Sequence, residues 1–322
     1  MNLVGMPENR MFALAVAALC SLVACGPARQ VSESGFGAYE VSLAAWSDGL
    51  ALAWYDTRHG NAELYVRPLD AMGRAAGPEL RVTATPAQSY EADIAPFADA
   101  FAIAWYEESA DGALSAQLGV WSRDGTQRWT TSVAVGTGHS RNAIVRNFGD
   151  ALFCAWIEAD ADGNEGVWGG WWELDGKVRA APELLGAAGA NTWNLNAAVA
   201  ESGAALVVFD AQAGTRAEEL FVATLADGRA SLVQLSADDG VASKYPDIAL
   251  AGADAALTWY DERAARVERE PDGLVGAGDQ AVARRFCARL GRSCAERGRR
   301  ARRRDARGGL VHDRPLTGDV AG

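Results

Sequence analysis

The sequence predicts an all-β fold, a β-propeller made of four-stranded blades of about 51 residues each, with four full repeats and a truncated fifth. Three observations lead to this prediction. A strand motif recurs at a fixed interval, two further markers recur in step with it, and no part of the repeat shows a sustained helical periodicity. The repeats occupy residues 38–263.

The clearest marker is an apolar strand that ends in an acidic residue. It reads Ala-Trp-Tyr-Asp at 53–56 and has counterparts at 104–107, 155–158, 207–210 and 258–261. The acids are Asp56, Glu107, Glu158, Asp210 and Asp261, at intervals of 51, 51, 52 and 51 residues. A period of this length indicates a repeat architecture.

Two other markers keep the same period. A turn recurs at Gly73, Asp124-Gly125, Asp175-Gly176 and Asp227-Gly228, and a hydroxyl recurs at Ser89, Ser140, Thr192 and Ser243. The second unit divides into four short apolar segments at 94–97, 101–106, 114–121 and 128–135, each bounded by Asp, Gly or Ser.

The strand at 101–106 shows how the units must pack. Phe101, Ile103 and Trp105 fall on one face, while Ala102 and Ala104 fall on the other, so neither face is polar. A blade held between two neighbouring blades covers both faces. A β-sandwich or a β-solenoid is the alternative, although solenoid coils are usually shorter and sandwiches repeat less regularly.

The N-terminus predicts export. Residues 1–24 contain an apolar run after Arg10 that is too short to span a bilayer, as in a signal peptide. The segment Leu22-Val23-Ala24-Cys25-Gly26 resembles the bacterial lipobox, which implies lipidation of Cys25 and anchoring to a membrane. We expect residues 25–37 to be the anchor and linker. Gly26 in place of Asp resembles sorting to an outer membrane.

The C-terminal segment, residues 264–322, differs from the rest. It holds 14 Arg and 8 acidic residues, against 16 basic and 34 acidic residues before it, and it contains neither Trp nor Tyr. We expect a basic, disordered tail. Clustered arginines would suit nucleic acid or anionic lipid, but 28 Arg against two Lys also suggests a GC-rich gene read out of frame, which we favour. The acidic body disfavours nucleic acid as a partner.

Chemical motifs are few, and we predict neither catalytic residues nor a cofactor. His59, His139 and His312 fit neither a metal site nor a catalytic triad. Cys154 lies in an apolar strand, where we expect a buried, unreactive thiol. Asp160, Asp162 and Asn164 begin a calcium-loop pattern, but Glu165 and Trp171 depart from it, so a solvated turn is preferred over a calcium site.

One segment, Ser122 to Trp129, resembles the Asp-box of sialidase-like propellers, with Ser122, Asp124 and Trp129 at the matching positions and Thr126 replacing a glycine. The resemblance implies a structural turn between the third and fourth strands of a blade. It would also imply an arginine cluster and a tyrosine nucleophile, which no motif places here. Tyr55, Tyr106 and Tyr260 recur with the repeat, so blade architecture explains them better.

The broader pattern of residues 54–65, Trp-Tyr-Asp-x-Arg-x-Gly-Asn-x-Glu-Leu-Tyr, resembles propeller lipoproteins of myxobacteria and their relatives. That resemblance implies a non-catalytic, surface-anchored protein of the cell envelope that binds a protein or a glycan. The alternative is a sialidase-like, glycan-active enzyme, which would need two carboxyls or a tyrosine nucleophile in the central pocket.

Overall fold

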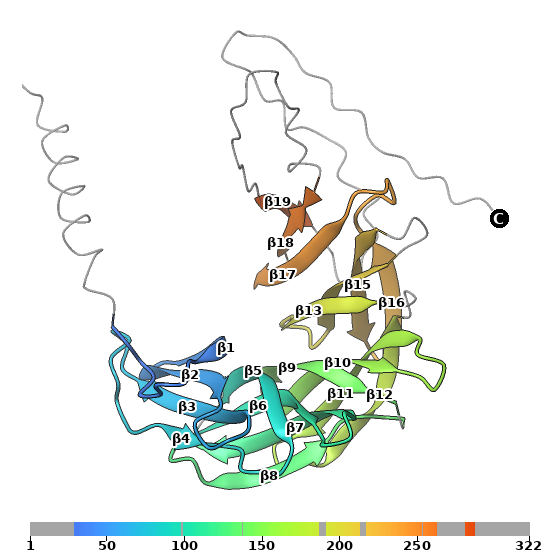
Figure 1. The fold of residues 1–322 in the computed structure, drawn as a ribbon. Helices are drawn as coiled ribbons and strands as arrows, with labels where there is room; N and C mark the ends of the chain where they lie inside the picture. Colours follow the sequence, from blue (N-terminus) through green and yellow to red (C-terminus); the bar gives the residue numbers. More distant parts are fainter. Residues whose placement is uncertain are drawn as a thin grey trace, which may run out of the picture.

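The computed structural model describes residues 29–97, 99–136, 138–186, 191–212, 217–252, 254–262 and 281–286. Within these ranges the regular elements are β-strands, arranged in five antiparallel sheets (Figure 1). None of the described residues forms a helix that could span a lipid bilayer. The prediction of an all-β propeller with four-stranded blades is confirmed.

Each sheet is formed by strands that follow one another in the chain. Sheet 1 contains β1 (Tyr39–Trp46), β2 (Gly49–Asp56), β3 (Glu63–Leu69) and β4 (Leu80–Arg81), and sheet 2 contains β5 (Gln88–Phe97), β6 (Ala100–Glu108), β7 (Leu114–Ser122) and β8 (Gln127–Ser132). Sheet 3 contains β9 (Ser140–Phe148), β10 (Ala151–Ala159), β11 (Glu165–Glu173) and β12 (Val178–Gly186). Sheet 4 contains β13 (Thr192–Val199), β14 (Ala205–Gln212), β15 (Glu218–Ala226) and β16 (Arg229–Gln234), and sheet 5 contains β17 (Ser243–Ala251), β18 (Asp254–Asp261) and β19 (Ala281–Phe286).

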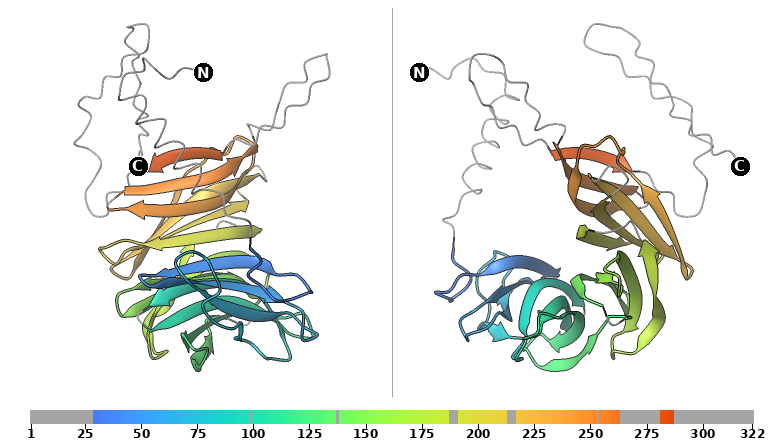
Figure 2. Two further views of the ribbon diagram at one scale, coloured as in Figure 1. Left: turned by 90° about the vertical axis from the view of Figure 1, so that its left-hand side faces the viewer. Right: turned by 45° about the vertical axis from the view of Figure 1, so that its right-hand side comes forward.

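The five sheets follow one another around an arc, with sheets 1 and 5 at its two ends (Figures 1 and 2). The first strand of each sheet lies innermost, and β1, β5, β9, β13 and β17 contact one another in that order. The strand β19 belongs to the segment that we expected to be a tail, yet it pairs with β18 along its length. The other residues of that segment lie outside the described ranges.

Four apolar cores hold the arc together, one between each pair of consecutive sheets. Between sheets 2 and 3, for example, Ala102 and Leu118 pack against Cys154 and Trp156, all of them with no exposed surface. The sequence pattern of strands without a polar face is therefore explained, because sheets 2, 3 and 4 are each covered on both sides. Burying each large apolar side chain contributes roughly 1.5 to 3 kcal/mol.

The repeated acid at the end of the second strand ties successive elements together. The indole N–H of Trp156 donates to Glu158 Oε2 at 2.8 Å, and the backbone N–H groups of Val135 and Gly136 also donate to this carboxylate. In sheet 1, Trp54 donates to Asp56 in the same way at 3.2 Å. A buried carboxylate needs such partners, which explains why Trp and the acid recur two residues apart.

The innermost strands share a second feature that alternation of side chains does not reveal. Their pairing with the next strand is interrupted by a bulge, and Glu40, Glu91, Asn142 and Tyr245 adopt φ values of 50° to 54° there. Residues other than glycine rarely adopt positive φ, and residues that do so are concentrated at functional sites. The bulge changes the direction of one side chain in each innermost strand.

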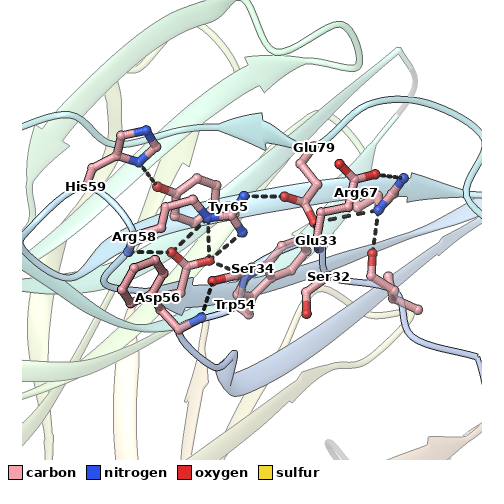
Figure 3. Close-up of polar contacts among 12 residues, drawn as sticks. Ser32, Glu33, Ser34, Trp54, Asp56, Arg58, His59, Tyr65, Arg67 and Glu79 are labelled. Carbon is pink, nitrogen blue, oxygen red and sulfur yellow. Dashed lines mark hydrogen bonds and ion pairs between the residues drawn. The ribbon is translucent and has the colours of Figure 1, made fainter.

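Residues 31–34, here called the strap, lie against sheet 1 (Figure 3). Arg67 donates to the Val31 carbonyl at 2.6 Å and to Glu33 at 2.8 Å. Glu79 accepts from the Glu33 backbone N–H and from Arg58, both at 2.5 Å. The described part of the segment that we expected to be an anchor and linker is therefore bound to the first sheet.

Candidate functional site

A cavity of about 630 Å³ lies along the innermost strands. It is called the axial cavity below. Sheets 2 to 5 each contribute side chains to its wall, so it depends on the arrangement of the whole arc. The residues that line it are Glu91, Tyr106, Arg141, Asn142, Trp193, Asn194, Asp210, Glu218, Lys244 and Tyr245.

A single repeat position supplies much of this wall. Glu91, Asn142, Asn194 and Tyr245 follow one another at intervals of 51, 52 and 51 residues, and each comes from the innermost strand of a different sheet. Three of the four have the positive φ described above. The fold therefore presents four polar side chains, a Glu, two Asn and a Tyr, from one repeat position where the innermost strands meet.

Glu40 occupies this same position in sheet 1, 51 residues before Glu91. The two glutamates lie on neighbouring innermost strands, β1 and β5. Burial, together with the negative charge of Glu40, raises the pKa of Glu91 to about 7, although Arg141 opposes the shift. Burial also raises the pKa of Glu40, and the backbone of Glu91 opposes that shift.

Four tyrosines extend from this carboxyl pair along sheets 1 and 2. The ring centroids of Tyr39 and Tyr55 are 5.4 Å apart, those of Tyr55 and Tyr90 are 5.1 Å apart, and those of Tyr90 and Tyr106 are 5.5 Å apart. Burial raises the pKa of Tyr106, and the charges of Glu91 and Glu40 add to the shift. Its phenol therefore stays protonated at neutral pH.

The opposite wall carries exposed aromatic rings. Trp193 is 53% exposed and Tyr245 is 64% exposed, although both lie in innermost strands. The Arg141 guanidinium lies 5.4 Å from the centre of a Trp193 ring and forms an ion pair with Glu165 at 2.6 Å. Aromatic faces beside polar side chains are suited to binding a ligand that has both an apolar surface and hydroxyl groups.

Asp210 holds the backbone of this wall in place. It accepts hydrogen bonds from the backbone N–H groups of Asn194 and Tyr245, both at 2.9 Å, and from the Asn194 side chain at 2.9 Å. The bulges of sheets 4 and 5 are thus joined through one carboxylate. This explains why Asp210 is fully buried although it follows no tryptophan.

Ser122, Asp124 and Trp129, which resemble an Asp-box, lie far along the blade at the turn between β7 and β8. Asp124 accepts the Thr126 backbone N–H at 2.9 Å, and the Trp129 indole N–H donates to the Leu174 carbonyl of the next sheet at 2.8 Å. They form a turn that contacts the neighbouring blade and do not contribute to the axial cavity.

Asp160, Asp162 and Asn164 form a hairpin turn. Asp160 Oδ1 accepts the backbone N–H groups of Asp162 and Asn164, both at 2.9 Å, so the turn satisfies its own carboxylate. No group of three or more His, Cys, Asp or Glu side chains in the described ranges could hold a metal ion. Cys25, the expected lipidation site, lies outside the described residues.

The comparisons with known proteins found a likeness in fold. No protein-family model matches the chain, and no curated protein matches its sequence. An α-L-arabinofuranosidase from Podospora anserina is 8% identical, with 72% of this chain and 86% of that one covered and a TM-score of 0.43. An endo-arabinase from Bacteroides thetaiotaomicron is 10% identical (76% and 92% covered, TM-score 0.44), and a β-fructofuranosidase from Bombyx mori is 9% identical (79% and 62% covered, TM-score 0.44). The likeness is distant and concerns the propeller arrangement.

These matches correct one expectation. We expected a protein without catalytic activity, whereas the solved structures of similar fold are those of glycoside hydrolases, and the non-catalytic interpretation is therefore withdrawn. It depended on the lack of a catalytic motif in the sequence. A site assembled from one residue of each repeat leaves no local motif, because its members are about 51 residues apart. The matches concern the fold alone, so any activity of this chain must be argued from its own cavity.

Proposed function

We propose that the protein cleaves glycosidic bonds in the axial cavity, with Glu40 and Glu91 as its pair of catalytic carboxyl groups. The observation that carries this proposal is a pair of carboxyl groups on neighbouring innermost strands: Glu91 lines the cavity of about 630 Å³, and the charge of Glu40 contributes to the raised pKa of Glu91. Glycoside hydrolysis in most families uses two carboxyl groups with different protonation states. Two neighbouring carboxyls of unequal burial provide such a difference.

Glu91 is suited to be the general acid. With a pKa of about 7, roughly half of Glu91 is protonated at pH 7, so it can donate a proton to the oxygen of the leaving sugar. Glu40 is the more exposed carboxyl of the pair and is suited to activate water or to attack the sugar. Trp193 offers an exposed aromatic face on which a sugar ring could stack.

A sialidase-type mechanism fits the cavity less well. Its tyrosine nucleophile would have to lose a proton, whereas the surroundings of Tyr106 raise its pKa and keep the phenol neutral. Arg141 is the one arginine that lines the axial cavity in the described ranges, and it is already paired with Glu165. Carboxyl chemistry on a sugar without an acidic group is therefore favoured.

The proposal is tested by assaying the full chain against a panel of aryl glycosides and plant and bacterial polysaccharides. We expect hydrolysis that falls by about a hundredfold or more in Glu91→Gln and Glu40→Gln, since each removes one acid–base group. Glu201→Gln, at an exposed residue of a turn, is the matched control and should keep full activity. Full activity of Glu91→Gln, or no hydrolysis of any substrate by the unaltered chain, would refute the proposal.

We also propose that the protein is exported and anchored through lipidated Cys25 in the cell envelope, at the outer membrane where the cell has one, as in the propeller lipoproteins that it resembles. The position of the strap supports a short tether. Five residues lie between Cys25 and Val31, so the first sheet would lie within about 20 Å of the membrane surface. Metabolic labelling with palmitate should be lost in Cys25→Ser and retained in Cys20→Ser, and label retained in Cys25→Ser would refute the anchor.

A further inference from the structure

Among the described residues, sheet 1 has one face that no other sheet covers (Figures 1 and 2). Leu43 on β1 is 57% exposed, and Leu50 and Leu52 on β2 are half-buried on the same side. In each of sheets 2 to 5, the residues at the corresponding places are at most 7% exposed, because they face the preceding sheet. These residues are Ile94, Phe101 and Ile103; Val145, Leu152 and Cys154; Ala197, Ala205 and Val207; and Ile248, Ala255 and Leu257.

Sheet 5 has the opposite uncovered face. Ala256 and Thr258 on β18 are exposed and point away from sheet 4, against which Leu257 and Trp259 pack. In each of sheets 1 to 4, the residues at the corresponding places are at most 3% exposed, because they face the following sheet. These residues are Ala51 and Ala53; Ala102 and Ala104; Phe153 and Ala155; and Leu206 and Val208.

The uncovered faces of sheets 1 and 5 therefore correspond to the two sides of the interface between consecutive sheets. That interface occurs four times within the molecule. The strap closes the outer part of the sheet 1 face, over Trp54 and Arg67, and leaves the part near the axis open (Figure 3). This open part lies on β1 and β2, and the exposed residues of sheet 5 lie on the equivalent strands β17 and β18. Large side chains on one face meet small side chains on the other, as in the existing interface between sheets 1 and 2.

We infer that the open face of sheet 5 binds the open face of sheet 1 of a second copy of this chain. Sheets 1 and 5 of one molecule lie at opposite ends of the arc, so the matching face that is free to approach is that of another copy (Figure 1). Because the contact joins two different faces, a pair of molecules still has one free sheet 1 face at one end and one free sheet 5 face at the other. The association is therefore head-to-tail and continues beyond two copies.

The first test is sedimentation velocity on the full chain over a wide range of concentration, in mild detergent so that the expected lipid anchor does not itself cause association. We expect a mass that rises with concentration. Ala256→Arg should stay monomeric, since a charge replaces a small apolar residue in the contact, and Ala230→Arg on the exposed strand β16 should associate like the unaltered chain. A monomer at all concentrations would overturn the inference, as would closure of the ring within one chain.

A mixing experiment distinguishes head-to-tail contact from contact between like faces. Leu43→Arg blocks the open face of sheet 1 and leaves the open face of sheet 5 intact. Ala256→Arg leaves the open face of sheet 1 intact and blocks that of sheet 5. Each variant should be monomeric alone, and an equimolar mixture should form a complex of two chains and no larger species. If either variant associates by itself, or if the mixture stays monomeric, the inference is wrong. Both residues are exposed in the single chain, so circular dichroism should show unaltered folding.

Discussion

Glu40 and Glu91 occupy the same position of the first two repeats, on the neighbouring innermost strands β1 and β5, and the charge of Glu40 helps to raise the pKa of Glu91. Both residues lie where the innermost strand of their sheet bulges, and both have positive φ. One carboxyl is therefore placed beside a second carboxyl in a partly buried site. Like charges at close range disfavour double ionisation, so the pair holds a proton to higher pH than a free glutamate does.

The pair makes a prediction for stability that is independent of activity. The folded protein keeps a proton on Glu91 up to a pKa of about 7, whereas the unfolded chain releases it near 4.5. The stability that this proton provides is complete below pH 4.5 and is lost as the pH rises through 7. Glu91→Gln should therefore unfold with nearly the same free energy as the unaltered chain at pH 5 and with about 2 kcal/mol more at pH 8.

Urea denaturation at both pH values measures this difference, with Glu201→Gln as the control that should follow the unaltered chain. Equal stability of Glu91→Gln and the unaltered chain at pH 8 would show that Glu91 is not held in its neutral form.

A second prediction concerns Arg146, which links sheets 2, 3 and 4. It donates to Asp93 at 2.6 Å, to Asn196 at 2.5 Å and to the Ala197 carbonyl at 2.7 Å, and it is largely buried. Arg146→Met should lower the unfolding free energy by about 2 to 3 kcal/mol, because Asp93 and the Ala197 carbonyl lose a charged hydrogen-bond donor in a partly buried site.

Arg128 provides the matched control for Arg146. It also pairs with an aspartate, Asp99, at 2.8 Å, but that carboxylate is 79% exposed. Arg128→Met should change the unfolding free energy by no more than about 0.5 kcal/mol, since exposed ion pairs contribute little. Equal losses in the two variants, measured by urea denaturation, would contradict the role of Arg146 as a link between sheets.

The third prediction concerns the tryptophan that precedes the repeated acid. Trp156→Phe removes the indole N–H that donates to Glu158 and leaves space in a fully buried core, so we expect a loss of about 2 to 3 kcal/mol in unfolding free energy. Trp193→Phe, at a ring that is 53% exposed, should cost less than about 0.5 kcal/mol. A loss in Trp193→Phe as large as that in Trp156→Phe would contradict this account.

The sequence was sufficient to predict the blades, because Trp54 and its counterparts recur at a period that only repeated units produce. The axial cavity could not be predicted in the same way. Alternation of apolar and polar side chains predicts side-chain directions only in a regular strand. The bulge at Glu91 turns its side chain toward the axis through a positive φ, which the amino-acid type does not predict. The one available signal was the spacing of 51 residues between Glu40 and Glu91, with Glu91 two residues after the hydroxyl marker Ser89 and outside the expected strand at 94–97.

The fourth unit shows a second limit of prediction from spacing. Its motif at 207–210 aligns Val208 with Trp54, but in the structure Phe209 packs toward the preceding sheet, as Trp156 does in sheet 3. The pairing of Ala197 with Val207 is offset by one residue from the pairing of Leu43 with Leu52 in sheet 1. A shift of one residue exchanges the two faces of a strand, and only the packing of neighbouring sheets decides between them.

The last prediction concerns Cys154, whose thiol is fully buried between sheets 2 and 3. Burial raises its pKa, and the nearby charge of Asp93 adds to the shift, so both access and thiolate formation are suppressed. In the native protein, Cys154 should therefore resist iodoacetamide, with labelling followed at this residue by peptide mass spectrometry. In urea it should be alkylated at the rate of a free cysteine. Rapid labelling without denaturant would show that the interface between sheets 2 and 3 opens readily, which the continuous apolar core on both sides of Cys154 argues against.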